Sequence, residues 1–288
     1  MAESALYRPA RRATAARFKR LAWITVLLAV SALFIFPFYW LLISAFKTRA
    51  QIFTMPPQFI PMPVVLENFA NVLAQTGLAR AFLNSCIIAA GHVTLALFLC
   101  SLGGYAFAKF REAPGRDGLF AFVLGTMMIP GAVTMIPVFM VLVHLHLVNT
   151  YWAMIIPGAA NAFGIFWMRQ YIDANVPDDL IAAARIDGCG EFGIYRHVVV
   201  PIARPALAAL GILVLISTWN NLMWAFVVMR KEEMYTMPLL IYLLQGEMRT
   251  PYGMVMAGGV LATLPLVVAF LCFQRSFIQG ITAGALKA

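Results

Sequence analysis

The longest uncharged stretch of the chain reads GLFAFVLGTMMIPGAVTMIPVFMVLVHLHLVNTYWAMIIPGAANAFGIFWM, residues 118–168. Its 51 residues include no Asp, Glu, Lys or Arg. As one helix it would be roughly 76 Å long, more than twice the hydrocarbon thickness of a bilayer. The stretch therefore predicts two membrane spans that are separated by a turn at the polar segment HLHLVNT, residues 144–150.

The composition of the whole chain agrees with a membrane protein. Of its 288 residues, 62% are hydrophobic and 11% are charged, and the mean hydropathy is +0.84. A soluble domain has about 25% charged residues. So few charges cannot cover a water-facing surface of this size, which excludes a soluble globular enzyme and a disordered chain.

Uncharged stretches of sufficient length predict an all-α, polytopic membrane protein with six transmembrane helices. The spans are expected near residues 21–46, 81–108, 118–143, 151–168, 205–229 and 252–274. They form a transmembrane domain of residues 21–285 that follows a basic tail, residues 1–20. The first span is too long for a secretory signal peptide and ends in bulky side chains, so we expect it to be retained.

The distribution of Lys and Arg predicts the orientation of the chain. Six spans place both termini on one side of the membrane. Fifteen of the 21 Lys and Arg then lie on the side of the termini, and six lie on the opposite side. Because basic residues accumulate in cytoplasmic loops, both termini are predicted to be cytoplasmic.

Motifs of an energy source or of a catalytic centre are missing from the sequence. It contains no phosphate-binding GxxxxGK[ST] loop, no HExxH or GxSxG motif, and no charged residue deep in a span. The four cysteines show no metal-ligand spacing, and His92, the one histidine in a span, is interpreted as a packing residue. We therefore expect no catalytic residue, metal or cofactor. The alternatives are a passage driven by a partner, a self-contained carrier or channel, and an integral-membrane enzyme.

The loop after the fourth span, residues 171–204, is too regular for a linker. Residues 178–186 predict a helix that starts after Pro177, and Gly188 and Gly190 predict its end. A second short helix is expected over residues 191–200, stopping before Pro201. One face of the first helix would carry Leu180, Ala183, Ala184 and Asp187. Such a knob would either dock a separate motor or rest on lipid headgroups.

This knob resembles the EAA loop of the inner-membrane permease subunits of ABC importers. The family pattern is E-A-A, three residues, Gly, nine residues, and I-x-L-P. It falls here on residues 182–184, Gly188 and residues 198–201. Further segments resemble the carbohydrate branch of the family, the maltose-type second permease: SAFKT (44–48), PPQF (56–59), ENFANVL (67–73), FLNS (82–85), NTYWAMIIP (149–157), FGIFWMRQ (163–170) and TWNN (218–221). The similarity covers about residues 20–285.

The resemblance implies a type I ABC importer permease fold in the plasma (inner) membrane of a prokaryote. It implies a transport subunit, not an enzyme, that forms half of a path for a sugar or oligosaccharide. The implied partners are a second permease in a heterodimer, a cytoplasmic ATPase dimer, an extracytoplasmic sugar-binding protein and membrane lipid, with no nucleic acid. The residues implied in coupling to the ATPase are Asp179, Ala182, Ala183, Ala184, Asp187, Gly188 and Pro201. Ala182 replaces the first Glu of the motif, and Asp187 or Asp179 is expected to supply the charge.

A cluster of polar and aromatic side chains in the fifth span is the candidate substrate path. Its members are Ser217, Thr218, Trp219, Asn220, Asn221 and Trp224, with Asn161 from the fourth span. Amides and aromatic rings suit the hydroxyl groups and C–H faces of a sugar, although the same amides also join helices in membranes. No basic residue lies mid-span, which favours a neutral sugar over a phosphate. The outer loops, residues 48–79 and 230–251, would meet the binding protein or serve as solvated connectors.

Overall fold

The computed structural model describes residues 8–246 and 251–285, with side chains for residues 19–246, 251–272 and 274. The described residues form helices, turns and loops without a strand, which confirms the all-α prediction. The chain divides into two compact units. The first comprises residues 1–72 and 251–260, and the second comprises residues 73–250 and 261–288.

The first unit is built on the long helix α1 (Arg8–Ala45), followed by α2 (Arg49–Ile52) and the start of α3 (Glu67–Gln75). Within α1, Lys19–Ala45 is 27 residues long and apolar enough to cross a membrane. Large side chains along it are exposed, among them Trp23 and Phe34. Such a surface suits lipid or another protein rather than water, so α1 agrees with the first predicted span.

The loop that follows α1 is fixed to the end of that helix by polar contacts. Lys47 is fully buried, its Nζ donates to the Gln58 carbonyl at 2.5 Å, and it lies 4.2 Å from the centre of the Trp40 ring. Thr48 and Gln51 cap α2 reciprocally through side chain and backbone. This part of the predicted outer loop is therefore attached to the end of α1.

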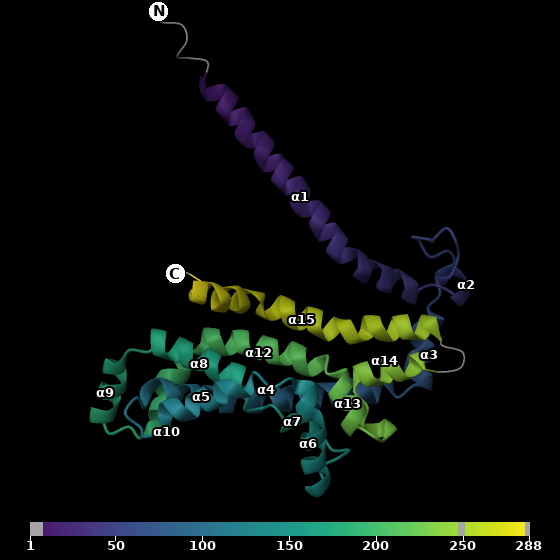
Figure 1. Cartoon of the computed structure of the whole chain (residues 1–288). Helices are drawn as coiled ribbons and strands as arrows, with labels where there is room; N and C mark the ends of the chain where they lie inside the picture. The colour runs from purple at the N-terminus through teal and green to yellow at the C-terminus, as the bar shows by residue number, and fades with distance from the viewer. Residues whose placement is uncertain (1–7, 247–250, 286–288) are drawn as a thin grey trace, which may run out of the picture. The chain divides into compact units, whose positions relative to one another are not determined.

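The second unit is organised around α4 (Leu78–Lys109) (Figure 1). Helices α8 (Ala162–Asn175) and α12 (Arg204–Trp219) pack along it and bury a shared core. The contact with α8 is very close at Gly104, where a Cβ atom would lie 2.8 Å from the backbone nitrogen of Arg169. Only glycine allows this approach of the two helices.

The remaining helices of this unit extend the structure at both ends of α4. They are α5 (Arg116–Thr126), α6 (Gly131–His144), α7 (Trp152–Ile155), α9 (Asp178–Ile186), α10 (Glu191–Ile194), η1 (Tyr195–Val199), α11 (Val200–Ile202), α13 (Leu222–Val228), η2 (Glu232–Met234) and α14 (Met237–Gln245). Within this unit, α9 and α10 lie at one end, while α6 and α13 lie toward the other (Figure 1). The last helix, α15 (Tyr252–Ala285), runs through both units.

Three of the predicted spans are continuous helices long and apolar enough to cross a membrane. They correspond to Lys19–Ala45, Leu78–Lys109 and Tyr252–Cys272. Up to five spans result if two bent helix pairs are each counted as one. One pair is α5 with α6, bent by 103°, and the other is Glu191–Ile202 with α12, bent by 81°. The count of six spans, and with it the orientation of the termini, stays a prediction.

The other three predicted spans are interrupted for local reasons. The range 118–143 breaks between Thr126, where α5 ends, and Pro130, the N-cap residue of α6, which has no N–H to extend the preceding helix. The range 205–229 breaks at Asn220 and Asn221, and the range 151–168 breaks between α7 and α8. The turn predicted at residues 144–150 is confirmed, because His146 and Asn149 adopt positive φ angles of 55° and 62°.

Candidate functional site

The knob predicted from the sequence begins with α9, whose bounds, Asp178–Ile186, match the prediction. It ends at Gly188, which has a φ of +82°. The Gly188 N–H donates to the Arg185 carbonyl at 3.0 Å, and the Cys189 N–H donates to the Ala184 carbonyl at 2.9 Å. These two bonds form a Schellman cap, which needs the left-handed conformation that glycine adopts readily.

The second helix of the knob differs from its prediction. It does not stop before Pro201 but continues from Glu191 to Ile202 through α10, η1 and α11. The reason is a π-helical turn in which the Val200 N–H donates to the Tyr195 carbonyl, five residues earlier. Pro201 is the second residue of α11 and directly follows this π-helical turn, near the end of the continuous helix.

Most of the predicted coupling residues face outward on this knob. Asp179, Ala182, Ala183, Asp187, Gly188 and Pro201 are exposed, and Ala184 is half-buried. Ile181 is the side chain of α9 that turns inward and is buried. Two large apolar side chains that were not predicted from the sequence also lie on the knob surface: Ile186, which is 87% exposed, and Phe192. Together with Leu180, they give the knob exposed apolar side chains in addition to the carboxylates of Asp179 and Asp187.

The start of α9 is attached to the end of α4 by charged groups. Lys109 Nζ lies 2.5 Å from Asp178 Oδ1 and also donates to the Val176 carbonyl at 2.6 Å. Arg111 pairs with Asp173 at 2.8 Å and approaches Asp178 at 3.5 Å. The hydrogen bond from Lys109 lowers the pKa of Asp178 below its ordinary value, so this carboxylate stays charged at neutral pH.

The end of α9 is attached to the same helix through Glu191. Arg185 Nε donates to Glu191 Oε1 at 2.8 Å, and the Tyr105 hydroxyl donates to Glu191 Oε2 at 2.7 Å. The hydrogen bond from Arg185 is the largest cause that lowers the pKa of Glu191. No local sequence pattern pairs Arg185 or Lys109 with these partners, so the sequence predicts neither contact.

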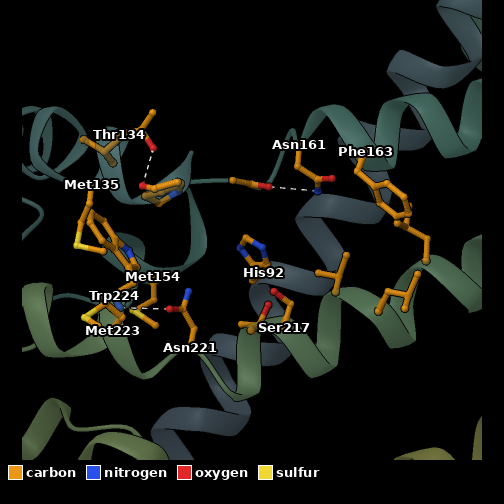
Figure 2. A pocket seen from close by; sticks show the side chains of 18 residues that line it. His92, Thr134, Met135, Met154, Asn161, Phe163, Ser217, Asn221, Met223 and Trp224 are labelled. Carbon is orange, nitrogen blue, oxygen red and sulfur yellow. Dashed lines mark hydrogen bonds between the residues drawn. The ribbon is translucent and has the colours of Figure 1, made fainter. Parts of the chain in front are cut away.

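A cavity of about 550 Å³ opens beside α4, within the ~300–1,000 Å³ typical of small-molecule sites (Figure 2). Figure 2 shows His92, Ser217 and Asn221 projecting toward it from α4, α12 and the turn before α13. Its other polar lining side chains are Thr134, Asn161, Thr218 and Trp224. The lining contains no Asp, Glu, Lys or Arg.

The cavity brings together most, but not all, of the residues predicted for the substrate path. Ser217, Thr218, Asn221, Trp224 and Asn161 line it. Trp219 and Asn220 lie outside it. The Trp219 indole N–H donates to the Ala262 carbonyl at 3.1 Å, and the Asn220 amide donates to the Ile216 carbonyl of its own helix at 2.9 Å.

Several lining residues also stabilise the helices that hold them. Asn221 Oδ1 accepts from the Trp224 N–H at 3.2 Å and so caps α13. Asn161 caps α8 in the same way by accepting from the Gly164 N–H at 2.7 Å. The Trp224 indole donates to the Ala153 carbonyl at 2.9 Å. The breaks at these residues therefore place hydroxyl, amide and aromatic groups around the cavity.

His92 is both a packing residue, as predicted, and part of the cavity wall. Its Nδ1 lies 2.8 Å from the Ile155 carbonyl. Since a carbonyl only accepts, Nδ1 carries the proton in this contact, which leaves Nε2 of a neutral ring as an acceptor. The contribution of His92 and Thr134 to the cavity was not predicted from the sequence, because both come from helices other than the polar fifth span.

A second polar cluster fixes the loop before α14. Asn84 is fully buried and donates to the carbonyls of Glu233 at 2.8 Å and Tyr235 at 2.9 Å. Ser85 Oγ accepts from the Met237 N–H, and Asn149 Oδ1 accepts from the N–H groups of residues 230 and 231. Asn84 and Ser85 therefore hold a loop in which Glu233 is exposed.

An all-helical chain with long apolar helices, an uncharged cavity and a two-helix knob has the architecture of a membrane transport permease. The family model described as "Binding-protein-dependent transport system inner membrane component" matches residues 100–283. The chain belongs to this family. It is thus a permease subunit of an ABC importer.

Curated relatives and a solved structure match nearly the whole chain. The arabinooligosaccharides transport system permease protein AraQ of Halalkalibacterium halodurans is 36% identical over 88% of this chain and 91% of the relative. The lactose transport system permease protein LacG of Rhizobium radiobacter is 36% identical over 89% and 92%. A crystal structure of a bacterial ABC transporter involved in alginate import matches with a TM-score of 0.78 and 25% identity, over 91% of this chain and 97% of that one.

Proposed function

We propose that this chain forms half of the translocation path for a neutral sugar or oligosaccharide in an ATP-driven importer. The observation that carries the proposal is the cavity, whose polar groups are amides, hydroxyls and a histidine without a formally charged lining residue. Such groups exchange hydrogen bonds with sugar hydroxyls, and Trp224 and Phe163 offer rings for stacking on C–H faces. Relatives named for arabinooligosaccharide and lactose transport support the same substrate class.

The knob is proposed as the docking element for a separate ATPase. Exposed Ile186, Leu180 and Phe192 provide an apolar contact, and Asp179 and Asp187 provide charge in place of the Glu that Ala182 replaces. ATP binding to the partner would favour one of two pore states by binding one of them more tightly. The proposed assembly contains this chain, a distinct second permease, two ATPase subunits and an extracytoplasmic binding protein, in the inner membrane with both termini cytoplasmic.

Filling the cavity tests the proposed path. Ser217 is exposed and lines the cavity. Asn220, three residues later at the C-cap of α12, is also exposed but does not line it. We expect Ser217→Phe to lower ATP-driven sugar uptake about tenfold or more, because a bulky ring blocks a sterically limited path. Asn220→Phe is the matched control and should keep most of the uptake. Uptake assays in cells, normalised to the amount of chain in the membrane, measure both.

Equal uptake by the Ser217→Phe and Asn220→Phe variants would contradict the assignment of this cavity to the path. Hydrolysis of ATP by the assembled complex should persist in Ser217→Phe, because the substitution lies far along α12 from the knob.

A further inference from the structure

The coupling helix α9 is held at both of its ends by one transmembrane helix. At its start, Asp178 is bound by Lys109 at 2.5 Å. At its end, Arg185 is bound by Glu191 at 2.8 Å, and Glu191 in turn accepts from Tyr105 at 2.7 Å. Tyr105 and Lys109 are four residues apart, so they lie on the same face of α4. We call this pair the α4 posts.

The α4 posts are rigid, since each is buried in the protein. Tyr105 is 3% exposed, and the side chain of Lys109 is likewise 3% exposed. Their partners on the knob are much more exposed, at 60% for the Asp178 side chain and 44% for that of Glu191. Hydrogen bonds to charged groups are stronger than neutral ones and fix direction as well as distance. The buried donors of α4 therefore attach the exposed carboxylates of the knob to the protein interior.

A third contact extends the attachment to the second helix of the knob. Ser101, one turn before Tyr105 on α4, shares a hydrogen bond of 2.7 Å with the hydroxyl of Tyr195 in η1. The rings of Tyr105 and Tyr195 lie 6.1 Å apart. Both helices of the knob thus contact the same segment of α4.

This attachment offers a direct path from the knob to the cavity. His92, which lines the cavity, lies on α4 thirteen residues before Tyr105, which is roughly 20 Å along a helix. A helix that is continuous over this length transmits a displacement of one end to the other. The buried Ile181 of α9 adds apolar packing against the same core, but this packing lacks the directed bonds to charged groups that the α4 posts provide.

We propose that Tyr105 and Lys109 are positioning residues that carry the movement of α9 into α4 and hence to the cavity wall. The inference rests on the proposed docking of an ATPase at α9. It goes further by assigning α4 as the helix that moves with the knob, and by naming the side chains that make the two move together.

The test is the number of sugar molecules transported per ATP hydrolysed. The chain is reconstituted in vesicles with its second permease, ATPase and binding protein, and uptake and hydrolysis are measured in the same sample. We expect Tyr105→Phe with Lys109→Met to lower this ratio about tenfold, because each change removes a bond to a charged group. Hydrolysis itself should continue. Tyr105→Phe alone, which removes one oxygen atom from a buried ring, should give a smaller loss in the same direction.

Two further variants separate coupling from a merely structural role. Lys109→Arg keeps the positive charge that Lys109→Met removes, so it should retain most of the wild-type ratio of transport to hydrolysis. A loss of folded complex would instead lower uptake and hydrolysis together. Tyr242→Phe, on the exposed face of α14, is the control for the loss of a hydroxyl. A wild-type ratio in the double variant and in Tyr105→Phe would overturn the inference while leaving the proposed function intact. Absence of ATP-driven uptake by the wild-type assembly would contradict the proposed function and the inference with it.

Discussion

Replacement of Gly104 by alanine is expected to disrupt the packing of α4 on α8, whereas the same change at the neighbouring Gly103 should be tolerated. A Cβ at position 104 would lie 2.6 Å from Met168 Cβ and 2.8 Å from the Arg169 backbone nitrogen. These are atoms of the α8 backbone and its first side-chain carbon, which cannot move unless the helices separate. A Cβ at position 103 would meet Ile165 Cγ1 at 3.4 Å, which is an ordinary contact.

The expected loss for Gly104→Ala is about 1–3 kcal/mol, the usual cost of overpacking a well-packed interior. This loss of stability should also affect the knob, because the α4–α8 contact lies within the core against which the knob packs. Thermal unfolding of the purified protein in detergent measures it. Gly103→Ala should melt at or above the wild-type temperature, since alanine favours a helix over glycine by about 1 kcal/mol. Indistinguishable melting of the two variants would contradict the close approach of these helices.

The second large effect is expected at the end of α9. Gly188 has a φ of +82°, which proline cannot adopt, and its N–H closes the cap on Arg185. Gly188→Pro should therefore unwind the end of α9. We expect normal insertion into the membrane, continued ATP hydrolysis by the partner, and a loss of uptake of about tenfold or more, the usual size of a broken allosteric coupling. Gly190→Ala is the control, because Gly190 has a φ of −69° and open space around its Cβ position.

Asp187→Lys separates docking from helix stability at the same site. Asp187 is the exposed C-cap residue of α9. A lysine there complements the helix dipole by about 0.3–1 kcal/mol, so the helix itself should not be weakened. A loss of uptake in this variant would then arise at the contact with the ATPase. Wild-type uptake in both Gly188→Pro and Asp187→Lys would refute the role of the knob in coupling.

Features that depend on short stretches of sequence could be predicted, and α9 is the clearest case. Its start after Pro177 and its end at Gly188 follow from local backbone chemistry, and the structure has the same bounds. Long apolar helices such as α4 could also be predicted, from the length of the uncharged stretches that form them. The breaks within three predicted spans were not, because an uncharged run does not reveal where a proline or a capping asparagine interrupts a helix.

Contacts between distant segments could not be read from the sequence. Asn220 and Asn221 are adjacent and chemically identical, yet of the two only Asn221 lines the cavity. The reason is that α12 ends at Trp219 and α13 begins after Asn221, so the helix is interrupted at these two residues. The bond from Tyr105 to Glu191 joins residues 86 positions apart, and Lys109 and Asp178 are 69 positions apart. No periodicity pairs such residues. The packing of α4 against α8 and the knob is what brings them together.

The most direct test of the account is to purify the tagged full-length chain in mild detergent and identify its partners by mass. We expect an ATP-hydrolysing subunit and a second, distinct permease in stoichiometric amounts, and we expect Asp187→Lys to reduce the amount of the ATPase subunit. A wild-type chain that purifies alone, and that remains alone after cross-linking in membranes, would contradict the assignment of the knob as a motor dock and favour a self-contained carrier or channel.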